Sequence, residues 1–600
     1  MRESLRAYGW AWRVAGRSGW WRIAIVVLAN LLLAVHGSAT AVSLGFMVDG
    51  VANGDTARIV GGSVSAALLV ALMFGAFSVM LPVQTTVTER SIHEVDQRLI
   101  RLAGGMGTIE PYENAGFADR LTTVRREPSA IISVVWSSVS SLSFLFGIAV
   151  AMTALAYIDP RLLLLPLAGI PVILATRAAG RIRNRAVDEA AITRRASDHL
   201  FSVLTDPDYG KEVRVFRSGG FLLGTHRAAR REGNTLLSRA DVTASVLVFA
   251  GWIFFGTAWG LALAMVASSA VSGSIGVGEV ATVIAMANVI QNQVTGMSGL
   301  TRDLISGTGM VRRFLWLEDH ARTARRPVPE RGDAAGAGAA GAAGIVFTDV
   351  AYRYPDAEAD ALSGVNVFVP AGASVMVVGE NGAGKSTFVR LLLGLCAPTG
   401  GSVAFRGLGA GAGAGAEPDS GAEPERGVLA TAAFQDAARF ELTLRESIGV
   451  GAVERASDEE AVRGALADSG ARFTVEELDT QLGRRWGGRE LSGGQWQQVA
   501  VARSFMRRDV GLLVFDEPNA GLDPIIEDRL YRRYMAAREH IVSELGISVL
   551  VTHRISPGVS ADLVLVFHEG RLAEAGSHEE LVERGGRYRE LYELQVRAYR

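Results

Sequence analysis

Six long apolar runs in the first three hundred residues restrict the fold more than any other feature of this sequence. Each run is able to cross a hydrocarbon core of about 30 Å as a helix of roughly 20 residues, because a helix satisfies its own backbone polar groups. The fourth run is short and contains Pro166 and Pro171, which a packed membrane helix tolerates. The predicted spans are residues 23–47, 64–87, 130–158, 162–175, 242–271 and 277–297.

The distribution of arginine predicts how these spans are oriented. The connection at residues 177–241 is rich in arginine, whereas the short connections at 49–55 and 159–161 are nearly free of cations. Because positively charged loops stay on the cytoplasmic side, both chain termini are predicted to be cytoplasmic. Trp20 and Trp21, beside the first span, are typical of a membrane interface. The predicted location is therefore the cell membrane, which the chain crosses several times.

Composition supports a division between membrane and water. Hydrophobic residues make up 49% of the chain and charged residues 20%, which is apolar for a soluble enzyme and too charged for a chain wholly embedded in lipid. A net charge of -2 gives no basic field of the kind that nucleic-acid-binding proteins use, so no nucleic acid partner is expected. The single cysteine, Cys396, excludes an intrachain disulfide and a thiolate metal cluster.

A Pro-, Gly- and Ala-rich segment at residues 325–344 predicts a linker between two domains. Residues 1–324 are predicted to form an all-α transmembrane domain of six spans with cytoplasmic helical extensions. Residues 345–600 combine short strand-like runs with helical patterns, which indicates a soluble α/β domain. A second Gly/Ala-rich segment, residues 407–427, interrupts that domain and is interpreted as a surface excursion.

The string GENGAGKS, residues 379–386, is predicted to hold a phosphate chain, and we call it the phosphate loop. It follows an apolar strand pattern and begins a helical one, so backbone N–H groups and the helix N-terminus face the anion. Lys385 is expected to bridge the β- and γ-phosphates of ATP, and Ser386 to ligate Mg²⁺. The predicted nucleotide contacts here are Gly379, Glu380, Asn381, Gly382, Ala383, Gly384, Lys385, Ser386 and Thr387.

Lysine is rare in this chain, which strengthens the interpretation of the phosphate loop. Among 60 basic residues, only Lys211 and Lys385 are lysines. A compact ammonium group settles between two phosphates more readily than a planar guanidinium does. The retention of lysine at position 385 is therefore typical of a site that needs an ammonium group.

The string VGLLVFDEP supplies a second part of the predicted site. Its apolar strand residues deliver Asp516 to the carboxyl end of a buried strand, where a carboxylate can hold magnesium. Glu517 follows directly and is placed to polarise an attacking water. The alternative is that these two acids only form a solvated strand end. The phosphate loop upstream argues against that alternative.

The string ELSGGQWQQVAVARSF predicts a second helix N-terminus that offers N–H groups to an anion, at Ser492, Gly493 and Gly494. Two such helix ends are one more than a single nucleotide needs within one domain. They are reconciled if two copies meet head to tail, so that each nucleotide lies between the phosphate loop of one copy and the Ser-Gly-Gly end of the other.

In combination these strings resemble an ATP-binding cassette (ABC) transporter of the exporter type, over nearly the whole chain. GENGAGKST, LSGGQ, LLVFDEP, AGLD and VLVTH occur in the order found in that family. The resemblance implies a transmembrane domain of six helices fused to an α/β P-loop NTPase domain. Six spans and one cassette make a half-transporter, which requires a second half. LSGGQ also adds Gln495 to the predicted nucleotide contacts.

The resemblance implies roles for further residues of the second domain. Tyr354 should stack on adenine, Gln435 should sense magnesium and the attacking water, and Asp523 should couple the two nucleotide sites. Glu517 is implied as the catalytic base, and His553 as a contact of the γ-phosphate. The predicted catalytic residues are thus Glu517, His553 and Gln435, and the predicted magnesium ligands are Ser386, Gln435 and Asp516.

Two cytoplasmic strings resemble the short coupling segments that such transporters rest on the cassette, and a solvated helix face is the alternative for both. They are IEPYENAGFADRL at residues 109–121 and LTDPDYGKEVRVF at residues 204–216. Several polar residues within the spans either face a translocation cavity or form interhelical hydrogen bonds. These residues are His36, Asn288, Gln291 and Asn292.

The function implied is ATP-driven transport by alternating access, and most members of this architecture export hydrophobic drugs, lipids or peptides. The expected cofactors are ATP and Mg²⁺. The expected partners are a second half-transporter, identical or not, the membrane lipid, and a small-molecule, lipid or peptide cargo. Two alternatives stay open: an importer on the exporter architecture, and a non-transporting membrane ATPase in a sensing complex.

Overall fold

The computed structural model describes residues 2–207, 209–324, 342–355, 357–408, 429–518, 524–553 and 560–598. They form two compact units. The first unit comprises Met1–Gly104 and Asp119–Asp319, and the second comprises Gly105–Ala118 and His320–Arg600. Most of the predicted linker, most of the Gly/Ala insertion and Asp523 lie outside the described residues.

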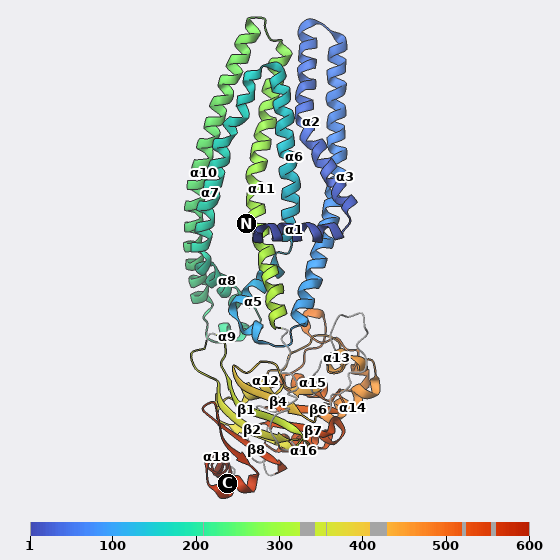
Figure 1. The fold of residues 1–600 in the computed structure, drawn as a ribbon, viewed down its shortest axis with the longest axis vertical. Coiled ribbons are helices and arrows are strands. Elements are labelled where there is room, and N and C mark those ends of the chain that lie inside the picture. Colours follow the sequence, from blue (N-terminus) through green and yellow to red (C-terminus); the bar gives the residue numbers. More distant parts are fainter. Residues whose placement is uncertain are drawn as a thin grey trace. The chain divides into compact units, whose positions relative to one another are not determined.

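The first unit is helical (Figure 1). Two of its helices continue well beyond the apolar runs, as α3 runs on to Gly104 and α10 begins at Gly219, so these helices extend into polar segments of the sequence. The helices are α1 (Arg2–Arg17), α2 (Trp20–Asn53), α3 (Thr56–Gly104), α5 (Ala115–Arg126), α6 (Ser129–Ile158), α7 (Ile170–Glu189), α8 (Ala191–Thr205), α9 (Gly210–Val215), α10 (Gly219–Val271) and α11 (Val277–Ala324).

Five described helical stretches are long and apolar enough to cross a membrane. They are Trp20–Asn53, Thr56–Gly104, Ser129–Ile158, Pro160–Glu189 and Gly219–Val271. The sixth predicted span forms the first part of helix α11, but polar residues lower its apolar character, so a count of six spans is not confirmed. Asn288, Gln291 and Asn292 are all exposed on this helix.

The proline-containing fourth span is not a regular α-helix throughout. Residues Pro160–Gly169 form a 3₁₀ helix, η1, which continues into α7. Proline lacks a backbone N–H and disfavours the α conformation of the residue before it, so two prolines close together favour such an interruption. Asp159 caps η1, because its carboxylate accepts a hydrogen bond from the Arg161 backbone N–H at 2.8 Å.

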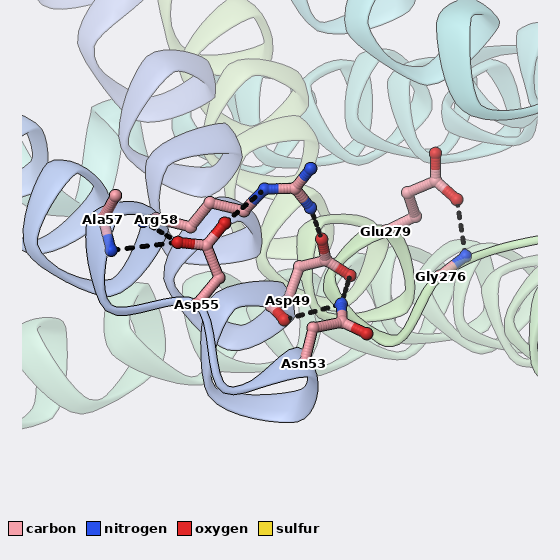
Figure 2. Close-up of polar contacts among 7 residues, drawn as sticks. All are labelled: Asp49, Asn53, Asp55, Ala57, Arg58, Gly276 and Glu279. Carbon is pink, nitrogen blue, oxygen red and sulfur yellow. Dashed lines mark hydrogen bonds and ion pairs between the residues drawn. The ribbon is translucent and has the colours of Figure 1, made fainter.

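Helices α2 and α11 approach closely near the connection between α2 and α3. A Cβ added to Gly278 would lie 2.3 Å from the carbonyl oxygen of Gly45, so this crossing requires glycine. Polar side chains near the ends of these helices form ion pairs and hydrogen bonds (Figure 2). Arg58 forms ion pairs with Asp49 and Asp55, and Glu279 accepts a hydrogen bond from the Gly276 N–H at 2.7 Å.

The second unit contains two sheets (Figure 1). An antiparallel sheet has the strand order β2-β1-β4, and a larger sheet has the order β5-β6-β7-β3-β8-β9, in which only β9 is antiparallel to its neighbour. The strands are β1 (Gly344–Tyr352), β2 (Leu362–Pro370), β3 (Ser374–Gly379), β4 (Gly400–Arg406), β5 (Ala430–Ala433), β6 (Val510–Asp516), β7 (Val542–Val551), β8 (Leu563–His568) and β9 (Arg571–Gly576).

The parallel strands place the candidate site at one edge of the larger sheet. Every residue of β3 and β6 is buried, as expected for strands covered on both faces. Both strands pair with β7, in which Val551 is aligned with Val377 of β3 and with Asp516 of β6. The carboxyl ends of β3 and β6 therefore lie at the same edge, which is where ligands bind in open α/β sheets.

Short helices complete the second unit. Phe388 of α12 packs in the main core, where its ring contacts those of Phe347 and Phe567. The helices are α4 (Glu110–Glu113), α12 (Lys385–Leu392), α13 (Leu444–Gly449), α14 (Glu459–Ser469), α15 (Gly493–Ser504), α16 (Pro524–Ile541), α17 (His578–Arg584) and α18 (Arg587–Ala598). A helical membrane region followed by an α/β domain is thus confirmed.

Candidate functional site

The phosphate loop connects β3 to α12 and depends on its glycines. Gly382 and Gly384 have φ angles of 79° and 100°, which side-chain-bearing residues rarely adopt. A Cβ on Gly384 would also lie 2.6 Å from Leu362 Cδ2. Gly384 forms the N-cap of α12, so the loop ends at a helix N-terminus as the sequence predicts. Asn381 and Ser386 are exposed, whereas Ala383 is buried.

Lys385 lies buried inside the phosphate loop. Its Nζ donates hydrogen bonds to the carbonyl oxygens of Gly379 at 2.9 Å and Glu380 at 3.0 Å. The same nitrogen lies 3.9 Å from Glu517 Oε1. Burial lowers the pKa of Lys385, and the nearby carboxylates of Glu517 and Asp516 oppose that shift. The ammonium group is thus held at the loop, beside the acids that end β6.

Asp516 ends β6 and has 8% of its surface exposed. Its pKa is raised to about 6, chiefly by burial and also by the negative charges of Glu517 and Asp436, whereas Lys385 and Arg390 act to lower it. A concentration of negative charge in a buried position is typical of a site that receives a cation.

Glu517 is held in an uncommon backbone conformation next to His553. Its φ angle is 46°, which costs a non-glycine residue on the order of 1–3 kcal/mol. Its backbone N–H donates to the Val551 carbonyl oxygen at 3.0 Å. His553 Nε2 lies 2.6 Å from Glu517 Oε1, so the pair predicted to act on the γ-phosphate and the water is in direct contact.

Tyr354 contacts α12, and Gln435 follows β5. The Tyr354 hydroxyl is 3.0 Å from Thr387 Oγ1 and accepts a hydrogen bond from Arg390 at 3.3 Å. The Tyr354 ring is half-buried and packs edge-on against Tyr352. Gln435 follows β5 and is exposed.

The Ser-Gly-Gly end of α15 is exposed. Ser492 caps the helix: its Oγ accepts from the Gln495 N–H at 3.3 Å, and Gln495 Oε1 accepts from the Ser492 N–H at 2.9 Å. A Cβ placed on Gly493 or Gly494 would meet nothing within 4 Å. Packing within the described part of this chain therefore does not require glycine at these two positions.

One contact of α12 escapes prediction from sequence. Arg390 of α12 forms an ion pair with Glu113 of α4 at 2.5 Å. The Ile109 N–H donates to the Leu395 carbonyl oxygen at 2.8 Å, and the Ala397 N–H donates to Glu110 Oε1 at 2.9 Å. This part of the first predicted coupling segment belongs to the second unit and contacts α12 and the residues that follow it. Its mixed aromatic and charged character indicated a contact but not its partners.

The second predicted coupling segment belongs to the first unit and includes α9. Val215 and Phe216 at its end have 76% and 72% of their surfaces exposed. Large apolar side chains exposed side by side are typical of a surface that meets another protein or a membrane.

A family model for "ABC transporter" matches residues 362–520, which include the phosphate loop, the helix end at Ser492 and the two acids after β6. The nisin transport ATP-binding protein NisT of Lactococcus lactis is 33% identical over 253 residues, which is 41% of this chain and 40% of that protein. The chain thus spans less than half of that relative.

Two other relatives are similar over most of their length. The subtilin transport ATP-binding protein SpaT of Bacillus subtilis is 26% identical over 81% of this chain and 77% of that protein. The beta-(1→2)glucan export ATP-binding/permease protein NdvA of Agrobacterium fabrum is 26% identical over 95% of this chain and 93% of that protein.

A solved structure has the same fold. It is described as a bacterial Atm1-family ABC exporter with ATP bound, and it aligns with a TM-score of 0.65 at 21% sequence identity. The alignment covers 96% of this chain and 99% of that one. Both units, the helical one and the α/β one, therefore have counterparts in one exporter chain.

Proposed function

Since this chain belongs to the ABC transporter family, with a membrane region and a cassette in one polypeptide, we propose that it is an exporter-type half-transporter. ATP binding and hydrolysis in the second unit drive cargo across the membrane through the helices of the first. The observation that carries this proposal is the convergence of Lys385, Asp516, Glu517 and His553 at one edge of a sheet, in a chain with membrane-spanning helices.

The residues at this edge fit MgATP. The phosphate loop offers backbone N–H groups, an ammonium group and a helix N-terminus, which are the groups that hold a triphosphate. Ser386, Gln435 and Asp516 would hold Mg²⁺, since hydroxyl, amide and carboxylate oxygens are its preferred ligands. When bound, this ion neutralises charge that develops between the β- and γ-phosphates. Tyr354 would stack on the adenine, next to Thr387.

Hydrolysis requires a group that orients and deprotonates the attacking water. Glu517 Oε1 already lies 2.6 Å from His553 Nε2 and 3.9 Å from Lys385 Nζ. Glu517 accepts the proton of the water as the water attacks the γ-phosphate. His553 keeps the Glu517 carboxylate in place and contacts the γ-phosphate, and Lys385 stabilises the charge on the transferred group.

A second chain completes each nucleotide site. Ser492, Gly493 and Gly494 form an exposed helix end with room for an approaching anion, which supports a partner's triphosphate as its ligand. Two copies that meet head to tail would bury two nucleotides between them. Asp523 couples the two sites in this arrangement. A non-identical half-transporter is the other candidate for the partner.

The first coupling segment connects the nucleotide site to the membrane helices. Glu113 of α4 binds Arg390, and Arg390 donates to the hydroxyl of Tyr354, the residue proposed to hold adenine. Movement at the base end of the nucleotide is therefore transmitted to α4 and on to the helices that flank it in the chain.

The nucleotide-binding unit and both termini lie in the cytoplasm of the cell.

Glu113→Gln is expected to uncouple hydrolysis from transport. The Glu113–Arg390 pair is partly exposed, so its contribution to stability is below about 1 kcal/mol. Its loss removes the side-chain link between α4 and α12, while the hydrogen bonds made by Ile109 and Glu110 remain. We expect basal ATP hydrolysis within about twofold of wild type and a transport-to-hydrolysis ratio roughly three- to tenfold lower. Glu127→Gln in the same connection is the matched control, and equal ratios in the two variants would contradict this role.

Transport itself is tested in vesicles. We propose that the exposed polar residues of α11, Asn288, Gln291 and Asn292, face the pathway, because polar groups that face lipid are costly. The cargo is a hydrophobic or amphipathic small molecule, lipid or peptide. Names of relatives that transport nisin and subtilin or export beta-(1→2)glucan suggest peptides and glucans as the first compounds to test.

ATP-dependent accumulation inside inverted vesicles, abolished by Lys385→Ala, is the expected result. Accumulation inside right-side-out vesicles that contain ATP would instead identify an importer. ATP hydrolysis without accumulation of any solute in the panel would favour the sensing ATPase.

A further inference from the structure

The last helix of the chain, α18, packs against the strand that leads into the phosphate loop. Its Tyr588 is fully buried and lies in one cluster with Met376 and Val378 of β3. Leu591 and Tyr592, three and four residues further on, pack on the same cluster, as expected for one face of a helix. The position of α18 is thus fixed relative to β3 and to the loop that follows it.

Arg587, at the start of α18, forms an ion pair with an acid of the phosphate loop. Its Nη2 lies 2.5 Å from Glu380 Oε1, and its Nη1 lies 2.9 Å from Glu590 Oε2 on its own helix. The Arg587 backbone N–H donates to Glu574 Oε1 at 2.5 Å. The guanidinium is therefore held in place between α18 and the loop.

The same helix also reaches the segment that carries His553. Gln595 Nε2 donates a hydrogen bond to the backbone carbonyl oxygen of His553. Residues 588, 591, 592 and 595 follow the spacing of one helical face, so packing on β3 and contact with His553 use the same side of α18. One helix thus contacts both the phosphate loop and the segment of the histidine next to Glu517.

Glu380 places a negative charge in the loop that is proposed to bind a triphosphate. Its side chain belongs to the loop itself, close in sequence to Lys385, and Asp516 and Glu517 add negative charge at the same edge of the sheet. An unneutralised carboxylate at this position would repel the nucleotide. Arg587 is the cation whose side chain pairs with it in the described part of the chain.

We propose that Arg587 supports nucleotide binding through its charge: it neutralises Glu380 of the phosphate loop and so removes a repulsion of the triphosphate of MgATP. Gln595, on the same helix, holds the backbone of His553 next to α18 through a hydrogen bond. This inference rests on the proposed function, because it assumes that the phosphate loop binds ATP. It assigns to α18 a role in nucleotide affinity in addition to its role in packing.

The test measures MgATP affinity in the full-length protein in lipid nanodiscs, with Glu517→Gln present in every sample to prevent turnover. Arg587→Gln should weaken binding about three- to tenfold at low salt, because one unit charge acts on the triphosphate through partly screened solvent. Glu380→Gln should tighten binding by about the same factor, because it removes a negative charge. The double variant Glu380→Gln/Arg587→Gln should return within about twofold of the parent.

Arg589→Gln is the matched control. Arg589 is on the same helix and forms an ion pair with Glu593 at 2.8 Å, so its replacement tests the general effect of removing an arginine from α18. Its MgATP affinity should equal that of the parent. The effect of Arg587→Gln should also shrink in about 0.5 M salt, whereas an effect through misfolding would not.

Two results would overturn the proposal: equal affinities of Arg587→Gln and Arg589→Gln, or a double variant as weak as Arg587→Gln alone. If Arg587→Gln does not fold, as judged by thermal unfolding without nucleotide, the MgATP affinity of Glu380→Gln becomes the test of the proposal. Tighter binding supports the proposal, and unchanged or weaker binding contradicts it. A parent that binds no more MgATP than a Lys385→Ala sample would refute the proposed ATP-binding function instead.

Discussion

Glu517→Gln is expected to slow ATP hydrolysis by about a hundredfold or more while MgATP binding is retained. The amide occupies the same volume as the carboxylate and keeps one oxygen near His553 Nε2, but it cannot accept the proton of the attacking water. Steady-state hydrolysis and equilibrium binding of MgATP, measured on the same lipid-reconstituted sample, separate the two effects. Loss of turnover with unchanged affinity assigns Glu517 to the chemical step.

Glu569→Gln is a matched control for this substitution. Glu569 has the same unusual backbone conformation, with a φ angle of 46°, and its side chain is exposed. Glutamine at this position tests whether the residue change itself disturbs such a backbone. Rapid turnover by the Glu517→Gln protein would contradict the assignment of Glu517 as the general base.

Lys385→Ala is expected to weaken MgATP binding at least about tenfold and to lower turnover as well. The buried ammonium makes two hydrogen bonds to loop carbonyl oxygens and stands between the loop and Glu517. Its loss removes a positive charge from a region that already contains Asp516 and Glu517. Lys385→Arg should not restore binding, because a planar guanidinium is larger and directional.

Lys211→Ala is the control that the composition of the chain provides, since Lys211 is the only other lysine and is exposed in the first unit. It should bind MgATP as the wild type does. Nucleotide affinity is best measured directly, by titration calorimetry or displacement of a fluorescent analogue. An affinity of the Lys385→Ala protein equal to that of Lys211→Ala would remove the basis for the phosphate loop as the triphosphate site.

The local parts of the candidate site could be predicted from sequence because each lies within one short string. Strand, loop and helix follow one another around Lys385, and β6 ends at Asp516 as its apolar run indicates. The contact between Glu517 and His553 was not predicted, because the family resemblance implied only a separate role for each residue. Packing of β6 and β7 as neighbours is what brings the two residues together.

The contacts made by paired surface side chains could not be predicted in this way. Glu113 and Arg390 are 277 residues apart in sequence, and Glu380 and Arg587 are 207 residues apart. Neither pair has a periodic pattern that would relate its members, because each joins separate elements through one long side chain. Arginine is also so common in this chain that no single one stands out before the fold is known.

The membrane half shows a different limit of sequence patterns. Long apolar runs identify α2, α3, α6 and α10, each of which is long and apolar enough to cross a membrane. Helix α11 combines a buried face, with Val283, Met286 and Ile290, and an exposed polar face, so its average composition no longer marks a span. An average over residues describes a helix with one apolar and one polar face less well than a helix that is apolar throughout.

The claim that two chains share each nucleotide site is tested most directly by mixing two inactive variants. Lys385→Ala damages the phosphate loop, and Gly494→Asp places a carboxylate at the Ser-Gly-Gly end, where the chain leaves open space for it. Aspartate in the first turn of a helix is favourable, so Gly494→Asp should fold. In a mixed dimer, one site combines both defects and the other has none.

Mixed dimers are isolated by two different affinity tags on the two variants, and their Mg²⁺-dependent ATP hydrolysis is measured in lipid beside each variant alone and the wild type. We predict that neither variant alone is active and that the mixed dimers regain a substantial part of the wild-type activity. Active wild type together with mixed dimers as inactive as the separate variants would contradict a nucleotide site shared between two copies of this chain.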